Sequence, residues 1–467
     1  MPDEALSEKL ARYLLSIQIE AISTRVIDAA KLHILDSLGC LLAGSCLQTG
    51  QLAYDLAVAA GGANSISTLI GSGRRAAYLD SVQAMSVAAH CGEMDDIHGG
   101  AGTCIGAMII PALIALGEKH GGSGRKLLEG CIIGYETIIR VGLSIEAPKL
   151  FARGWWPSTI CGAFGVAAAG AKFLNWDAEQ TANALGIASL HTGGMITGGN
   201  EGATARHLAF GHAARNGIYS LLASEQGFTG PQRAFEDPRG FCLTVCGEPK
   251  WDYLQSFGSF KLPEVAFKPY PCARQLHSGV EALLKVIRQH SLQPGMIGEI
   301  ELFLPTPNAA MMNRPTLTRS HAATVGSGQY VMAVTALRGK IDLASFEEAF
   351  LRSEEVRQLM SRVKVSSSAD LDRDYPKYWS GRVTVRSTTG QRYSDEVIIP
   401  KGESENPMTQ NEVEAKFLSL AAPVLSEDKA RSLINEVYML DARESLKSLL
   451  DALEVPTDFV SPSMRLG

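Results

Sequence analysis

The chain has 467 residues, of which 46% are hydrophobic and 20% charged, a composition typical of a globular protein with two or three domains. Its net charge is −6 and no basic cluster marks a nucleic-acid-binding surface, so we expect no nucleic-acid partner. No apolar stretch reaches the roughly 18 residues of a membrane span, the acidic N-terminus lacks a signal-peptide core, and the 9 cysteines show no paired framework, which together predict a cytoplasmic protein without membrane contact.

The first 266 residues are predicted to be helical. Ser23–Leu38 repeats apolar residues at helical spacing behind a Ser/Thr cap. Gly162–Leu174 is rich in small apolar residues, as expected of a helix buried on all sides. Asp177 and Gln180 stand at capping-box spacing and predict the start of another helix.

The pattern changes after residue 266. Ile297–Leu304 alternates with period two and predicts a strand, as do two β-branched segments around the turn at Ser387–Gly390. Those two segments are Arg382–Arg386 and Glu396–Ile399. The helices predicted nearby are Gln329–Leu337 and Leu343–Leu359, and the helical pattern returns from Asn411 to about Leu453. We therefore predict a mainly α protein with a smaller α+β domain. Residues 1–266 and 401–467 would form a large all-helical domain, and residues 267–400 an inserted lid domain.

A charged island runs from His90 to His98 between two apolar segments. It holds two histidines and the carboxylates Glu93, Asp95 and Asp96. Such a cluster suits acid–base chemistry, although a capped and salt-bridged helix end would have the same composition. A metal site is a further alternative, but the spacing matches no ligand motif, so we predict no metal.

Two further segments carry cations. Phe267–His277 contains Lys268, Tyr270 and Arg274 between stiffening prolines at the predicted domain crossing, and is either a carboxylate-binding site or a solvated hinge. Gly198–His207 is a Gly-rich turn that leads to Arg206. It would present backbone N–H groups and a guanidinium to an anion, or else form a loop with a solvent-facing arginine.

With these segments in place, the chain resembles the MmgE/PrpD family, which includes 2-methylcitrate dehydratase, cis-aconitate decarboxylase and iminodisuccinate epimerase. The resemblance covers nearly the full length. Its motifs are Glu93–His98, Gly130–Arg140, Arg153–Pro157, Trp176–Ala188, Gly227–Pro231, Phe267–His277 and Glu405–Thr409. It implies a large helical domain with a smaller α+β lid, a homodimer, and no metal or organic cofactor.

The resemblance also implies candidate site residues. Positions that keep the family pattern are Asp96, His98, Lys268, Tyr270, Arg274, His277 and Tyr330, with Tyr135 in a matching Gly-Tyr-Glu segment. Glu93 keeps an acid where the family has Asp, and Ile97 replaces a family Thr. Cys104 and Trp156 stand where the family has histidines, and Arg206 aligns with a family lysine. The cationic anchors are thus kept while two imidazoles are lost.

These departures favour one activity. A dehydratase must protonate a leaving hydroxide and a decarboxylase must protonate a new carbanion, whereas an epimerase only removes and returns a proton beside a carboxylate. We predict an epimerase that acts without a cofactor on a small polycarboxylate, first iminodisuccinate. The predicted proton-transfer residues are His98, Lys268, Tyr330 and Tyr135, and the predicted substrate-binding residues are Glu93, Asp96, Cys104, Trp156, Arg206, Tyr270, Arg274 and His277. The alternatives are a 2-methylcitrate-type dehydratase and a family member that binds its ligand without turnover.

Overall fold

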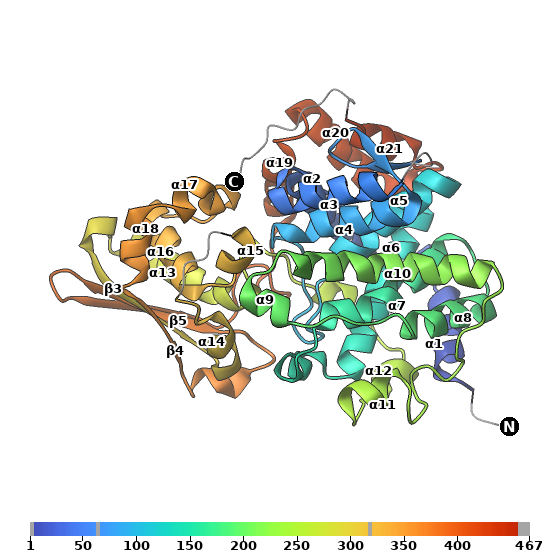
Figure 1. Ribbon diagram of the computed structural model, residues 1–467, viewed down its shortest axis with the longest axis horizontal. Coiled ribbons are helices and arrows are strands. Elements are labelled where there is room, and N and C mark those ends of the chain that lie inside the picture. The colour runs from blue at the N-terminus through green and yellow to red at the C-terminus, as the bar shows by residue number, and fades with distance from the viewer. Residues whose placement is uncertain (1–3, 62–65, 316–319, 456–467) are drawn as a thin grey trace.

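The chain folds around two hydrophobic cores. The computed structural model describes residues 4–61, 66–315 and 320–455. The larger core gathers residues between Leu6 and Phe267 with the C-terminal helices, and the second core is built from residues 272–397. Figure 1 shows the two parts side by side, with helices on the right and a sheet on the left. We call them the helical part and the sheet part; the exact domain boundaries stay a prediction.

The helical part contains fifteen of the described α-helices and one short hairpin. The helices are α1 (Leu6–Ser16), α2 (Thr24–Cys46), α3 (Gln48–Gly61), α4 (Tyr78–Cys91), α5 (Gly106–His120), α6 (Gly124–Ser144), α7 (Pro157–Phe173), α8 (Ala178–Ser189), α9 (Thr197–Glu201), α10 (Ala205–Glu225), α11 (Phe241–Cys246), α12 (Asp252–Gln255), α19 (Gln410–Ala421), α20 (Glu427–Tyr438) and α21 (Lys447–Leu453). The antiparallel hairpin joins β1 (Ser67–Leu69) to β2 (Arg74–Ala76). None of the described helices is long and apolar enough to cross a membrane.

Local chemistry explains several of these helices. Asp177 accepts from the Gln180 amide and begins α8, as the capping-box spacing predicts. The helix predicted at 23–38 is present as α2, and it extends beyond the predicted end to Cys46. Every residue of α7 is buried, and a Cβ on Gly165 would lie 2.2 Å from the Ile138 side chain. Glycine at that position lets α6 and α7 approach closely.

The sheet part has one mixed sheet covered by helices. Its strand order is β4-β3-β5-β6, in which β3 pairs parallel with β4 and the other neighbours are antiparallel. The strands are β3 (Ile297–Leu304), β4 (Val363–Ser367), β5 (Gly381–Ser387) and β6 (Arg392–Val397). The helices are α13 (His277–Gln289), α14 (Thr306–Met312), α15 (His321–Thr324), α16 (Gly328–Arg338), α17 (Glu348–Leu351) and α18 (Glu354–Met360).

Two predicted elements of this part were wrong in extent. The predicted helix over 343–359 is a 3-10 turn (Leu343–Phe346) followed by α17 and α18. Asp342 caps the first piece, Ser353 caps the last, and Glu347 between them is extended (φ −69°, ψ 154°). The strand predicted at 396–399 starts at Arg392 and ends at Val397. Strand β4 was not predicted, because its alternation spans only two apolar residues, Val363 and Val365.

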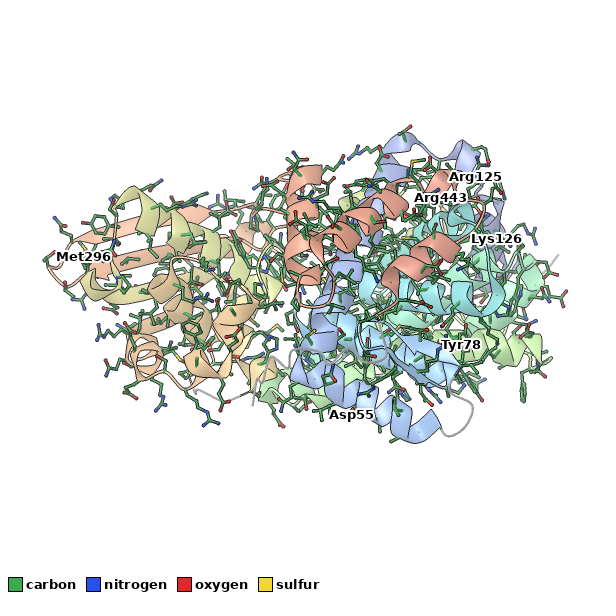
Figure 2. The ribbon with its side chains drawn as sticks, turned by 90° about the horizontal axis from the view of Figure 1, so that it is seen from above. Asp55, Tyr78, Arg125, Lys126, Met296 and Arg443 are labelled. Atoms are coloured by element: carbon green, nitrogen blue, oxygen red, sulfur yellow. The ribbon has the colours of Figure 1, made fainter. Side chains whose placement is uncertain are left out.

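The C-terminal helices return to the helical part. The Lys416 ammonium on α19 lies 2.6 Å from an Asp36 carboxylate oxygen on α2. Figure 2 places Met296 at the far end of the sheet part, and Arg443 beside Arg125 on the helical part. There the Gly124 amide donates to the Arg443 carbonyl at 2.8 Å. The sheet part is therefore inserted in the chain between two segments that build one helical core.

Candidate active site

A small cavity lies where the helical part meets the sheet part. Its charged and thiol lining comes from His90, Glu93, Cys104, Arg206, Lys268, Arg274 and Arg314. Its apolar lining includes Ile97, Phe151, Trp156, Ile196, Met311, Met312 and Val325. The cavity is therefore a small, largely apolar hollow with four cationic side chains in its lining.

The charged island forms one wall of this cavity. Helix α4 ends at Cys91, and Glu93 then adopts a left-handed backbone conformation with φ +53°. Such a conformation costs about 1–3 kcal/mol in a residue other than glycine and persists only where the surroundings impose it. Asp95 and Asp96 are fully buried, and the carbonyl of Met94, which precedes them, accepts from Lys416 at 2.6 Å.

Lys268 enters the same wall through a pair of backbone hydrogen bonds. The amide of Ile97 donates to Ala266 at 2.9 Å, and the amide of Ala266 donates back at 2.8 Å. This isolated bridge lies two residues before Lys268 and ties the crossing segment to the island. The Phe267 amide in turn donates to Gly402, the second crossing of the chain, at 3.1 Å.

The Lys268 ammonium is surrounded by acidic groups. Its Nζ lies 3.4 Å from Asp95 Oδ1, 3.5 Å from Glu93 Oε2 and 3.8 Å from Cys104 Sγ. Burial alone would lower the pKa of Lys268, but these neighbours outweigh burial and raise it above its ordinary value. Lys268 is therefore a fixed cation, and a poor base at neutral pH.

Glu93 is held as a carboxylate. Its side chain makes a close ion pair with the Arg206 guanidinium, which also lies 5.8 Å over the Trp156 ring. Burial would raise the pKa of Glu93, but Arg206 and Lys268 outweigh it and hold that pKa well below its usual range. One carboxylate thus organises two of the cavity's cations.

His90 and Asp95 form a buried pair beside Lys268. The Nδ1 atom of His90 lies 2.8 Å from Asp95 Oδ2, and its ring stacks on Phe210 with centroids 3.9 Å apart. Its Nε2 atom has no hydrogen-bond partner among the described residues, although Glu93 Oε1 lies 3.9 Å away. A carboxylate that orients one imidazole nitrogen leaves the other available to move a proton.

Cys104 completes the wall. A short turn carries the chain back from His98 to Thr103, whose carbonyl accepts from the His98 amide at 2.9 Å. The Cys104 amide then donates to Ser158 Oγ at 3.0 Å. Burial raises the pKa of the Cys104 thiol well above its ordinary value, so the group is a protonated thiol at neutral pH.

Asp96 and Tyr135, both predicted site residues, are absent from the cavity lining given by the described residues. The Tyr135 hydroxyl donates to Asp96 Oδ2 at 2.5 Å, and His33 Nδ1 lies 2.8 Å from the same oxygen. Asp96 Oδ1 accepts from the Gly106 amide at 2.9 Å, at the start of α5. These contacts assign both residues to a support behind the wall, where they fix the island and the helix that follows.

His98 and Tyr330, predicted to transfer protons, also lie outside the described lining. The Nδ1 atom of His98 accepts from the Ala101 amide at 2.9 Å, and its Nε2 lies 3.5 Å from Glu264. The Tyr330 hydroxyl donates to the Ser345 carbonyl at 2.7 Å inside the second core. Of the four predicted proton-transfer residues, Lys268 alone lines the cavity.

Tyr270 and His277 support Arg274 from outside the described lining. The Arg274 Nη1 donates to His277 Nδ1 at 2.9 Å, and His277 Nε2 lies 3.2 Å from the Cys272 carbonyl. Only a neutral imidazole with its proton on Nε2 satisfies both contacts. Tyr270 packs edge-on against His277, with ring centroids 5.3 Å apart.

The predicted binding residues Glu93, Cys104, Trp156, Arg206 and Arg274 do line the cavity. Arg314, Ser158 and Gln275 also line the cavity, although no sequence pattern marked them. His90 lines it as well, and neither His90 nor its partner Asp95 was among the predicted site residues. Asp95 follows His90 by five residues, and helix α4 ends between them at Cys91. The turn after that helix end is the sequence signal that could have predicted their contact.

The side chains of His90, Asp95 and Cys104 offer one ligand atom each within 4.8 Å of one another. This set of nitrogen, oxygen and sulfur donors would suit Zn²⁺. The Lys268 ammonium, however, already contacts Asp95 and Cys104 and would repel a second cation placed there. We therefore assign the cationic role in this wall to Lys268.

Comparison with known proteins matches the chain along most of its length. The family model described as the MmgE/PrpD N-terminal domain matches residues 8–254, and that of the MmgE/PrpD C-terminal domain matches residues 270–442. The chain is 27% identical to the cis-aconitate decarboxylase-like protein oryM of Aspergillus oryzae, over 96% of this chain and 97% of that protein. It is 27% identical to the cis-aconitate decarboxylase of Homo sapiens, over 97% and 95%, and 24% identical to that of Aspergillus terreus, over 97% and 96%. Because these two family models match most of its length, this chain belongs to the MmgE/PrpD family.

Proposed function

We propose that the protein transfers a proton, without a cofactor, at a carbon next to a carboxylate in a small polycarboxylate. The first candidate reaction is epimerisation, and iminodisuccinate is the first candidate substrate. The observation that carries this proposal is the wall in which the His90–Asp95 pair adjoins the fixed Lys268 ammonium. A base beside a fixed cation is the arrangement that stabilises a carbanion formed next to a carboxylate.

His90 would take the proton through Nε2. The electron pair released from the C–H bond would move into the neighbouring carboxylate, and Lys268 would stabilise the resulting aci-carboxylate. The raised pKa of Lys268 supports this electrostatic role rather than the proton-transfer role predicted from the sequence. Inversion would be completed when a water molecule delivers a proton to the other face of the carbon, while His90 releases the proton that it took to solvent.

Two features favour epimerisation within this chemistry. The cations Arg206, Arg274 and Lys268 can each hold a carboxylate, and a carboxylate bound by a cation is stabilised against leaving as neutral CO₂. In addition, the positions of Cys104 and Trp156, at which the family resemblance implies imidazoles, do not supply those groups.

Decarboxylation is the second candidate. The relatives that match over the full length are named cis-aconitate decarboxylases or proteins like them. The described sheet-part residues that line the cavity include no His, Cys, Tyr, Asp or Glu, so proton carriers stand on one wall only. A decarboxylase needs one proton for its carbanion and can receive it from that wall, whereas inversion needs access to both faces of the carbon.

One experiment separates the two candidates. Single stereoisomers of iminodisuccinate, and separately cis-aconitate, are incubated with the protein in D₂O and followed by proton NMR. Epimerisation predicts loss of the α-proton signal together with appearance of the other diastereomer. An unsaturated product or release of CO₂ without inversion would instead overturn the epimerase proposal.

A variant tests the assigned base. His90→Gln should lower kcat about 10²–10⁴-fold, the usual contribution of a general base. His212→Gln, an exposed change on α10, is the matched control and should leave kcat unchanged. Equal activity of His90→Gln and wild type would remove His90 from the mechanism.

We also propose, from the family resemblance, that the protein is a cytoplasmic homodimer whose only partner in catalysis is its small-molecule substrate. Light scattering on the eluting protein during gel filtration tests the dimer. A mass of one chain, 50.0 kDa, would contradict it.

A further inference from the structure

Arg314 differs from the other cations of the cavity. Lys268 and Arg206 both meet Glu93, and Arg274 Nε lies 3.1 Å from Glu403. Arg314 makes no ion pair with any described carboxylate at salt-bridge distance. Lys268 also meets Asp95, so the four cations of the cavity have three paired carboxylates among the described residues, and Arg314 is the cation left over.

The Arg314 guanidinium contacts backbone carbonyls instead. Its Nε donates to Met311 at 2.8 Å, and its Nη1 donates to Gly199 at 2.8 Å. A carbonyl is a dipole and compensates a full charge only in part. Two of the five N–H groups of Arg314 are used in these bonds, so others remain to bind an anion.

Arg314 is nevertheless held in a defined position. Its amide donates to Gln329 Oε1 at 3.0 Å, and its carbonyl accepts from Ser327 Oγ at 2.7 Å. A Cβ on Gly326 would lie 2.8 Å from Arg314 Nη1, so glycine at that position leaves room for the guanidinium. A fixed guanidinium loses little conformational entropy when it binds a carboxylate.

The field at this end of the cavity is positive. Burial lowers the pKa of Arg314, and the like charge of Arg206 lowers it further, although Glu93 acts in the opposite sense. Arg314 remains charged at neutral pH, because an arginine cannot be deprotonated under ordinary conditions. A carboxylate placed between Arg206 and Arg314 would relieve their repulsion.

We propose that Arg314 binds a second carboxylate of the substrate, remote from the carbon at which the proton moves, and thereby selects di- and tricarboxylates over monocarboxylates. This inference deepens the proposed function and rests on it for the class of substrate. The reacting carboxylate would lie at Lys268. The remote one would lie at the end of the cavity where the Arg314 side chain meets Gly199 of α9.

The test measures binding and turnover separately. Isothermal titration uses citrate as an inert tricarboxylate and acetate as a monocarboxylate, with wild type, Arg314→Gln and Arg314→Lys. Arg357→Gln, an exposed change on α18, is the control. Arg314→Gln should weaken citrate binding about tenfold or more, the effect of losing a charged hydrogen-bond donor, and change acetate binding less than about twofold. Arg314→Lys should fall between, because lysine keeps the charge but not the planar fork.

Steady-state kinetics distinguishes a binding role of Arg314 from a merely structural one. Arg314→Gln should raise KM about tenfold for a dicarboxylate substrate while kcat stays within about threefold, because the remote contact is the same in ground state and transition state. Equal citrate affinity of Arg314→Gln and wild type would overturn the inference. So would a fall in kcat and in melting temperature with no change in affinity.

The outcomes also separate this inference from the proposed function. Wild type that binds citrate through Arg314 but turns over no polycarboxylate would keep the anion site and remove the proposed activity. Wild type that inverts iminodisuccinate while Arg314→Gln keeps its KM would keep the activity and remove the role of Arg314. Wild type that binds neither citrate nor any polycarboxylate substrate would overturn both.

Discussion

At the scale of single residues, the environment of a side chain decides its chemistry more than its type does. Lys268 was a candidate proton carrier in the sequence, yet the carboxylates of Asp95 and Glu93 flank its ammonium and keep it charged. His90 received no role in the sequence analysis, yet its buried ring faces the cavity with one nitrogen oriented by Asp95. Acid–base roles are therefore better assigned from neighbours than from motif membership.

Lys268→Met should abolish turnover and destabilise the fold. The change leaves Glu93 and Asp95 buried without this cation, and removing one partner of a buried ion pair typically costs about 3–5 kcal/mol. Lys268→Arg keeps the charge and should recover most of the stability. Urea unfolding and kcat of both variants provide the check. Full stability of Lys268→Met would show that the acidic wall does not need this cation.

Buried neutral histidines should make the protein sensitive to acid. Burial lowers the pKa of His207 and the pKa of His277 well below the ordinary value for histidine. Nearby cations, such as Arg274 beside His277, lower these pKa values further. Below about pH 6.5 the unfolded chain binds protons at these sites and the folded chain does not, so stability falls as pH falls. Each group should contribute about 1.4 kcal/mol per pH unit until the pH reaches its folded pKa.

His277→Gln isolates part of this effect. Denaturant unfolding between pH 7.5 and pH 5 should show a shallower loss of stability for His277→Gln than for wild type. The exposed change His191→Gln should keep the wild-type slope. Identical slopes in all three proteins would mean that His277 is not the neutral imidazole its contacts with Arg274 and Cys272 require.

At the scale of elements, periodic and capped segments were predictable and non-local contacts were not. The α8 cap at Asp177 and the strand at Ile297–Leu304 follow from local patterns, and both are confirmed. Arg314 stands in an Asn-Arg-Pro stretch that resembles any loop, and only the contact with Gly199, 115 positions away, brings it to the cavity. Sequence patterns report local structure, whereas the site depends on contacts across the fold.

Helix α19 supports the island from the other end of the chain. Lys416 contacts Asp36 of α2 and donates to the carbonyl of Met94, between Glu93 and Asp95. Lys416→Met should therefore lower the free energy of unfolding by about 3–5 kcal/mol, because Asp36 is left buried and unpaired. It should also lower kcat, because the charged island would be displaced. The double variant Asp36→Asn with Lys416→Met should regain stability but not kcat. A double variant no more stable than the single one would argue against the pair.

At the scale of the whole molecule, the two parts meet on both sides of the cavity. On one side the chain crosses at Phe267 and Gly402, which are joined by a backbone hydrogen bond. On the other side α9 of the helical part packs against α15 of the sheet part, and Ser320 Oγ donates to the Gly202 carbonyl at 3.2 Å. Figure 1 shows α9 and α15 side by side where the parts adjoin. The cavity is thus held between a covalent crossing and a packed contact.

Gly202→Ala should open the packed contact without disturbing either core. A Cβ at Gly202 would lie 2.2 Å from the Ala323 side chain, so the parts must separate to admit it. Gly202 has φ +70° and ψ 25°, and Gly339→Ala is the matched control because Gly339 has φ +65° and ψ 11° with open space around its Cβ position. Both variants should lose about 1 kcal/mol of stability from backbone strain. Gly202→Ala alone should also lower kcat/KM by about tenfold or more, because a shift of about 1 Å between catalytic groups and substrate has effects of that order.

Thermal unfolding and steady-state kinetics of the two variants provide the comparison. Equal kcat/KM for both would mean that α9 and α15 touch without setting the geometry of the cavity.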